Sequence, residues 1–228
     1  MAPTPAETVI EAARDFIAAE SAAVLDLVDQ IDETFVRVAR LIHDDSGKVV
    51  LTGAGTTGYI AHRTAHLFSV SGTPAFYLNP TDALHGSMGA LRDNDILIAI
   101  SRGGESSEVN ELVRLLQGEN VPVVGITCKP KSTLGRTADI TVVLRETPDA
   151  DPGNVLAMGS TLVQAGWLDA LAVVLMRSRS HSWEKVLYTH PGGAVGLLST
   201  LPTAVEPLEI PDVDALSGSA ESAAEASP

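Results

Sequence analysis

The sequence predicts a single α/β domain built on a five-stranded parallel sheet that is flanked by helices. After Gly47, short runs rich in Val and Ile alternate with helical stretches, and this alternation is typical of parallel sheets. The length of 228 residues suits one domain with a substantial core. Hydrophobic residues make up 45% of the chain and aromatic residues only 4%, so the core should consist of aliphatic side chains.

The order of the elements follows from the spacing of the apolar residues. From residue 7 to residue 43 these residues recur at helical spacing, which predicts two helices or one long bent helix. The β-branched runs predict strands at 48–52, 75–78, 95–100, 121–127 and 140–144. Between and after them we expect helices at 59–71, 106–119 and 160–176, with a short turn at 132–136.

These patterns divide the chain into three parts. Residues 1–46 form an N-terminal helical segment that packs on the core or on partner subunits, and residues 47–200 form the α/β domain. Residues 201–228 are rich in Pro, Ala, Ser and acids. Because this tail has too little apolar area to offset its ordering entropy, we expect it to be disordered.

Charge and cysteine content exclude several classes of partner. With 15 Lys+Arg against 29 Asp+Glu, the formal net charge is −14, which repels nucleic acid and anionic membranes. Cys128 is the only cysteine, so neither an intramolecular disulfide nor a Cys-based metal site is expected. No secretory signal and no apolar run of ~18 residues occur, so we expect a cytoplasmic protein.

The first glycine-rich loop directly follows the first predicted strand. It reads Gly53-Ala-Gly-Thr-Thr-Gly58 and formally matches the dinucleotide fingerprint G-x-G-x-x-G. That function also needs an acid at the end of the second strand to bind the ribose, but no acid occurs there before Asp82. The alternative is a tight strand-to-helix turn that needs glycine for steric reasons alone.

A second loop, Ser101-Arg-Gly-Gly-Glu-Ser-Ser-Glu108, follows the third strand and precedes an apolar helix. Glycine backbone, serine hydroxyls and a helix N-terminus can together bind a phosphate without a basic residue. The alternative is that Glu105, Ser106 and Ser107 only cap the helix. Two such loops after the first and third strands would converge on one crevice, and this convergence favours the phosphate site.

Several further segments make the chain recognisable. It resembles the sugar isomerase (SIS) domain family and, within it, the arabinose 5-phosphate isomerases. The resemblance implies an SIS fold, which is a flavodoxin-like three-layer sandwich, and a phosphorylated sugar bound by the serine-rich loop. It also implies a homotetramer with active sites between subunits. The matching segments are Gly-Thr-Pro-Ala-Phe at 72–76, Ala-Leu-His-Gly-Ser-Met-Gly at 83–89, Ile-Ala-Ile-Ser at 98–101, Gly-Glu-Ser-Ser-Glu at 104–108 and His-Pro-Gly-Gly-Ala-Val-Gly at 190–196.

The chain also departs from this family pattern. Thr56 and Thr57 stand where the family has Lys-Ser, so a cation near the substrate is missing. Arg102 and Gly103 replace the usual Asn-Ser, which removes a hydroxyl and adds a charge. Many members carry a CBS regulatory module after the His-Pro-Gly-Gly segment, whereas an acidic tail follows here, so we do not expect nucleotide-type regulation.

Aldose-ketose interconversion proceeds through an enediol and needs a base near C1 and C2 and an acid for the carbonyl. This chemistry requires no metal or organic cofactor, so we expect none. Four residues that can do this work match positions that are functional in the family. They are His85, Glu108, Glu146 and His190. The candidates for binding the substrate phosphate are Gly55, Thr56, Thr57, Ser101, Gly103 and Ser106. His62 and His66 are four residues apart on a helix, but no third ligand is marked and we expect no metal there.

Two other functions stay open at this point. One is a phosphosugar-binding or regulatory SIS protein without catalytic activity, which the missing lysine favours. The other is isomerisation of a different substrate, such as a hexulose phosphate.

Overall fold

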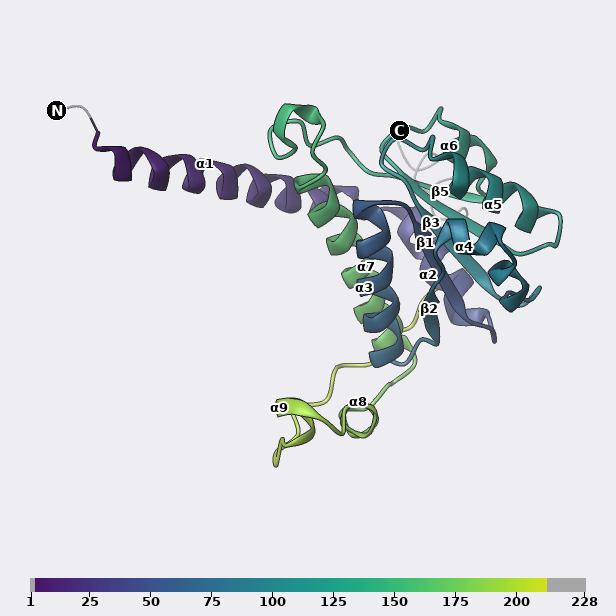
Figure 1. The fold of residues 1–228 in the computed structure, drawn as a ribbon. Helices are drawn as coiled ribbons and strands as arrows, with labels where there is room; N and C mark the ends of the chain where they lie inside the picture. Colours follow the sequence, from purple (N-terminus) through teal and green to yellow (C-terminus); the bar gives the residue numbers. More distant parts are fainter. Residues whose placement is uncertain (1–2, 213–228) are drawn as a thin grey trace, which may run out of the picture.

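A computed structural model describes residues 3–212 and contains one five-stranded sheet (Figure 1). All strand pairs are parallel, and the spatial order is β2-β1-β3-β4-β5. This arrangement confirms the predicted fold class. The strands are β1 (Val49–Gly53), β2 (Ala75–Tyr77), β3 (Ile96–Ile100), β4 (Val123–Thr127) and β5 (Ile140–Val143).

Helices cover both faces of the sheet and bury two separate apolar clusters. Because side chains alternate across a strand, Ile96, Ile98 and Ile100 of β3 join one cluster. Leu97 and Ala99 join the other. The first cluster lies under α2 (Glu33–Asp44), α3 (Thr56–Val70) and α7 (Gly159–Ser178), and the second under α4 (Pro80–Leu84), α5 (Ser107–Gln117) and α6 (Thr133–Thr137).

The central helix of the first face is α7. Its length and apolar composition would allow it to cross a membrane, but 67% of its most apolar stretch is buried inside the domain. Trp167 is 1% exposed and meets the ring of Phe35 from α2 edge-on, with ring centroids 5.1 Å apart. These contacts are those of a core helix.

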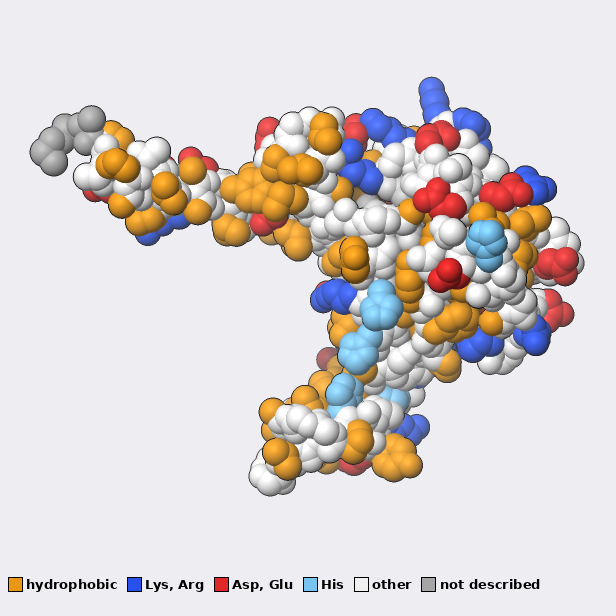
Figure 2. Space-filling model, viewed as in Figure 1, with side chains coloured by type: hydrophobic (Ala, Val, Ile, Leu, Met, Phe, Trp, Pro, Cys, Tyr) orange, Lys and Arg blue, Asp and Glu red, His pale blue; other side chains and the backbone are white. Residues whose placement is uncertain are grey.

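The N-terminal helices separate into a packed helix and a projecting one. α2 buries four side chains in the core. By contrast, α1 (Pro5–Asp26) begins at a capping box formed by Thr4 and Glu7 and contains no buried residue. It extends from the body as an arm, with only its C-terminal end beside α7 (Figure 1). Apolar side chains are exposed along this arm, including Val9 and Leu25 (Figure 2).

Beyond α7 the chain forms two short helices and then returns to the domain. These helices are α8 (Trp183–Thr189) and α9 (Gly193–Gly196). The returning segment, residues 201–212, is held by Arg40, which donates to the carbonyl oxygen of Ile210 at 2.8 Å. The Ile210 side chain is only 8% exposed and belongs to the first core cluster. The expectation of disorder is therefore wrong for 201–212, while residues 213–228 lie outside the described part of the chain.

The anchoring of this segment can be tested with two substitutions. Ile210→Ala should lower the free energy of unfolding by about 2 kcal/mol, the lower end of the range for removing a buried aliphatic side chain. Leu201→Ala, a matched control at a residue that is 41% exposed, should cost about 0.5 kcal/mol or less. Urea unfolding followed by circular dichroism measures both. Equal small effects would show that the segment is not anchored.

Candidate functional site

The candidate site lies where β1 and β3 end. Gly53, the last residue of β1, pairs with Ile100, the last residue of β3. The glycine loop at 53–58 and the serine loop at 101–108 therefore begin side by side, as the sequence led us to expect. In parallel sheets this edge is where ligands bind.

Steric requirements explain the glycines of the first loop. Gly55 has φ +58°, a value that L side chains rarely adopt, and a Cβ at Gly58 would lie 2.7 Å from the carbonyl oxygen of Gly53. The hydroxyl of Thr57 is buried and donates its single hydrogen to the carbonyl oxygen of Ala54 at 2.8 Å. A phosphate accepts hydrogen bonds, so Thr57 can offer it only the backbone N–H in this arrangement. The side chain of Thr56 is exposed.

The serine loop presents two hydroxyls that face each other. Ser101 Oγ lies 3.2 Å from Ser106 Oγ and accepts a hydrogen bond from the Gly104 amide at 3.1 Å. Ser106 is the N-cap residue of α5, but its side chain makes no capping hydrogen bond. Helix capping therefore does not account for Ser106. The two hydroxyls carry two hydrogens and use one between them, which leaves one hydrogen for a ligand.

Contacts with the start of α6 hold the serine loop in place. Gly104 has φ +68°, and a Cβ there would lie 1.9 Å from Ser132 Oγ at the start of α6. Its carbonyl oxygen accepts a hydrogen bond from the Leu134 amide at 3.0 Å. The Glu105 carboxylate accepts from the hydroxyl and amide of Thr133 at 2.7 and 2.9 Å, and these bonds lower its pKa. The shape of the loop is thus set without a ligand.

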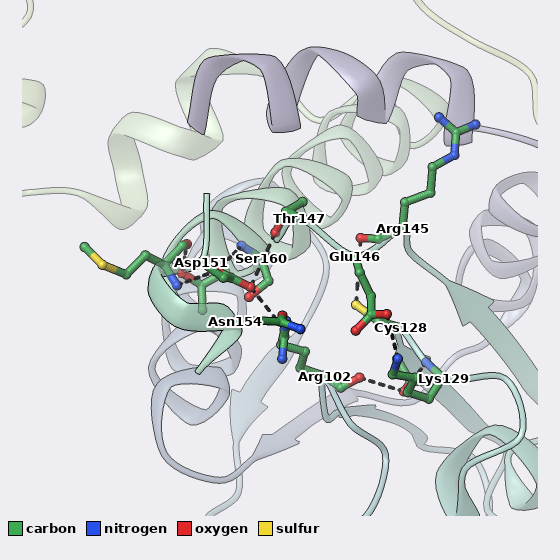
Figure 3. Close-up of polar contacts among 12 residues, drawn as sticks. Arg102, Cys128, Lys129, Arg145, Glu146, Thr147, Asp151, Asn154 and Ser160 are labelled. Atoms are coloured by element: carbon green, nitrogen blue, oxygen red, sulfur yellow. Dashed lines mark hydrogen bonds and ion pairs between the residues drawn. The ribbon is translucent and has the colours of Figure 1, made fainter. Parts of the chain in front are cut away.

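Arg102, in the serine loop, reaches over to the segment between β5 and α7 (Figure 3). Its Nε lies 3.1 Å from Asp151 Oδ2, and its Nη2 contacts Asn154 Oδ1. The backbone of Arg102 is also held, because its carbonyl oxygen accepts from the Cys128 amide at 2.9 Å and from the Thr127 hydroxyl at 3.1 Å. The sequence did not point to Asp151 or Asn154 as parts of the site.

Asp151 is fully buried, and several donors surround it. Its Oδ1 accepts from the amides of Met158 at 2.8 Å and Ser160 at 3.0 Å, at the N-terminal end of α7. Burial alone would raise the pKa of this carboxyl, but the hydrogen bonds at α7 and the charge of Arg102 hold it below the ordinary value. Asp151 is therefore ionised at neutral pH.

Glu146 and Lys129 form an ion pair on the neighbouring loops (Figure 3), with 2.6 Å between Oε2 and Nζ. The hydrogen bond from Lys129 lowers the pKa of Glu146. We expected a catalytic glutamate to have its pKa raised toward neutrality, and in this arrangement Glu146 does not. Nearby Cys128 is buried, and burial raises its pKa to about 11, so its thiol is neutral and a poor nucleophile.

Glu108 and His85 lie on neighbouring elements. Glu108 is in the first turn of α5, half-buried, and accepts a hydrogen bond from the Ser107 hydroxyl at 3.1 Å. His85 ends α4, which packs against α5, and its side chain is exposed. Glu108 thus lies two residues beyond Ser106 in the first turn of α5, and its carboxylate bonds to Ser107 rather than to Ser101 or Ser106.

His190 is separated from these residues within its own chain. It ends α8, its Nδ1 lies 3.0 Å from the carbonyl oxygen of Val186, and its ring centroid is 6.1 Å from that of His66. His66 is ten residues beyond Thr56, where α3 starts, and ten residues of helix span about 15 Å. His190 therefore lies toward the far end of α3 from the two loops (Figure 1).

An open depression of about 370 Å³ adjoins the first glycine loop. The Tyr77 hydroxyl donates to the carbonyl oxygen of Gly53 at 3.2 Å and closes one side. Within residues 3–212 no group of three His, Cys, Asp or Glu side chains is placed to hold a metal ion. The lining residues are Gly55, Gly58, Tyr59, His62, Tyr77 and Asn79.

Known proteins resemble this chain over most of its length. The arabinose 5-phosphate isomerase KdsD of Shigella flexneri is 34% identical over 186 residues, which cover 82% of this chain and 57% of that protein. KdsD of Francisella tularensis is 36% identical over 173 residues, 75% of this chain and 53% of that protein. The chain thus spans little more than half the length of these curated relatives.

Solved structures and a family profile agree with this resemblance. A protein of E. coli CFT073, solved in complex with A5P, superposes with a TM-score of 0.78 at 27% identity and covers 81% of this chain and 98% of that one. The SIS domain profile matches residues 42–174, which contain the whole sheet and both loops of the site. The chain therefore belongs to the SIS domain family.

Proposed function

We propose that this protein binds a phosphorylated sugar and interconverts its aldose and ketose forms, as the relatives named arabinose 5-phosphate isomerase do. The observation that carries the proposal is the pair of facing hydroxyls, Ser101 and Ser106, at the N-terminus of α5. It supports an anion site in a chain whose net charge of −14 would otherwise repel anions. We further infer a cytoplasmic location, since the single buried thiol needs no oxidising compartment.

The phosphate would be bound mainly by neutral donors. The free hydroxyl hydrogen of the serine pair, the first amides of α5 and the partial positive charge of the helix N-terminus all favour a phosphate. Gly103 leaves open space where a Cβ would stand, so the backbone can approach the ligand closely. In the first loop, Gly55, Thr56 and Thr57 would contribute at the start of α3.

The isomerisation moves a proton between C1 and C2 of the open-chain sugar. A base removes the C2 proton of the aldose while an acid protonates the carbonyl oxygen, which gives an enediol; protonation of C1 and loss of the O2 proton then give the ketose. A carboxylate with a lowered pKa, such as Glu146, would enter this cycle as a base rather than as an acid. We assign the proton transfers jointly to Glu108, Glu146, His85 and His190.

We propose that the active unit is a homotetramer with sites between subunits. In a single chain α1 buries none of its residues and exposes apolar side chains such as Ile10 and Ile17. Exposed apolar surface of this extent is typical of a subunit interface. Because His190 lies far from the two loops of its own chain, we infer that it acts in the site of a neighbouring copy.

The activity is tested by incubating the protein with a panel of pentose and hexose phosphates in deuterated water. We expect NMR to show deuterium entering at C2 of arabinose 5-phosphate and at C1 of the ketose formed from it. Replacing Ser101 and Ser106 together by Ala should weaken affinity for that sugar about 10- to 150-fold, the cost of one hydrogen bond to a charged group. Ser107→Ala is the matched control on the same loop and should bind normally. Binding without exchange of any sugar would identify a non-catalytic binding protein instead.

The shared site is tested by mixing a variant impaired in turnover with a variant impaired in phosphate binding, at a substrate concentration too low to saturate the second variant. His190→Ala should lose about 100- to 10,000-fold in turnover, the usual value of general acid-base help. In a shared site, the serine loop comes from one copy and His190 from a neighbouring copy. If His190→Ala and the Ser101/Ser106 double variant are refolded together in equal amounts, subunits mix at random. About a quarter of the sites then combine an intact serine loop with an intact His190. No recovery, or light scattering that gives only a 23.8 kDa monomer, would contradict the shared site.

A further inference from the structure

The side chain of Arg102 is held in place by two residues of the segment between β5 and α7. Its side chain is 22% exposed, with Nε 3.1 Å from the Asp151 carboxylate and Nη2 in contact with Asn154 (Figure 3). Nη1 makes no hydrogen bond with any residue between 3 and 212. Nε is buried and makes no hydrogen bond within residues 3–212, so the guanidinium is held by the ion pair with Asp151 and the contact with Asn154 and keeps unused donors.

The charge of Asp151 is compensated by other groups besides Arg102. Two backbone amides at the start of α7 donate to Oδ1, and the Thr147 hydroxyl lies 3.4 Å from Oδ2. The helix N-terminus adds a partial positive charge at the same place. Asp151 can thus orient Arg102 without cancelling its positive charge.

Besides Arg102, the cations near the serine loop include Lys129 and the exposed Lys131, which precedes Ser132 at the start of α6. Glu105 and Glu108 belong to the loop itself. Lys129, on the next loop, is paired with Glu146 at 2.6 Å. Arg102 directly follows Ser101 in the chain, so its positive charge is carried by the same loop as the hydroxyl pair. Of these three cations, Arg102 is the one whose ion-pair partner, Asp151, is fully buried, so its charge has a fixed position beside the loop.

We propose that Arg102, oriented by Asp151 and Asn154, determines the specificity of the site for doubly charged phosphate esters. The first glycine loop supplies no cation of its own, because its non-glycine residues are Ala54, Thr56 and Thr57. This inference rests on the proposed phosphosugar site but not on its catalytic activity. The competing role is a purely structural one, in which Arg102 only ties the segment at 147–160 to the serine loop.

The two roles differ in how they treat ligand charge. Arabinose 5-phosphate carries about two negative charges at pH 7.5, whereas arabinose 5-sulfate has nearly the same shape and one charge. If Arg102 acts through its charge, Arg102→Gln weakens binding of the phosphate ester about 10-fold and of the sulfate ester about 3-fold, so the preference for phosphate falls about 3-fold. Arg102→Lys keeps the charge and should keep most of the preference.

Isothermal titration calorimetry of the full chain with both esters measures these affinities without requiring turnover. Arg114→Gln is the control, because it removes the same charge from the exposed face of α5, where Arg114 pairs with Glu111 at 2.6 Å. It should leave both affinities unchanged within about 2-fold. Thermal melting identifies any variant that does not fold, and if Arg102→Gln is unfolded, the Arg102→Lys comparison decides.

Equal losses for both esters, with no rescue by lysine, would show a structural role and overturn the inference. Failure of the unaltered protein to bind either ester would overturn it together with the proposed function. If the phosphate preference depends on Arg102 but no sugar phosphate exchanges its proton, the inference stands and the isomerase activity is wrong. If Arg102→Gln isomerises the sugar normally and binds both esters with unchanged affinity, the proposed isomerase activity stands and the proposed role of Arg102 in specificity is wrong.

Discussion

The close contact between Gly104 and the start of α6 is the constraint on which the candidate site depends. It places the backbone of the serine loop against Ser132 at a distance that only glycine permits. The Leu134 amide and the two hydrogen bonds from Thr133 then hold the loop in one shape. Because the loop needs no ligand to adopt this shape, its hydroxyls and amides can bind an anion without a large ordering cost. In a strongly acidic chain, which repels anions, this small entropy cost of ordering the loop makes a phosphate site possible.

The sheet could be predicted well because buried parallel strands are marked by β-branched runs. The fourth strand was placed at 121–127 and starts at Val123 in the structure, since Pro122 precedes it and cannot donate to the ladder. The convergence of the two loops followed from the same topology. The prediction of disorder is wrong for residues 201–212. The composition of this segment does not show that Ile210 enters the core or that Arg40, Arg177 and Trp183 donate hydrogen bonds to its backbone carbonyl oxygens.

Details of the site were harder to predict than the fold. Arg102 and Asn154 are 52 positions apart, and the segment between β5 and α7 has no periodicity that would place its residues. Likewise, the spacing of the glycines places Thr57 in the first glycine loop, but it does not show that the Thr57 hydroxyl donates to the carbonyl oxygen of Ala54. The sequence named both serines, but only the structure shows that they face each other and that Ser106 does not cap the helix through its side chain.

A single chain leaves the proposed chemistry incomplete. The serine loop and Glu108 lie together, whereas His190 lies toward the other end of α3 and α1 extends into solvent. Both features have the same explanation if copies of the chain pack through α1 and each copy contributes its His190 to the site of a neighbouring copy. Assembly would then be part of the catalytic machinery rather than an addition to it.

The central claim, that the serine loop binds the phosphate of the ligand, is tested most directly by an NMR titration. A TROSY spectrum of the deuterated, ¹⁵N-labelled protein would be followed as arabinose 5-phosphate is added. We predict that the largest shifts occur at the amides of Gly103, Gly104 and the first turn of α5, and that inorganic phosphate moves the same signals. Shifts confined to residues around Tyr59 and His62, with the serine loop unchanged, would contradict the account.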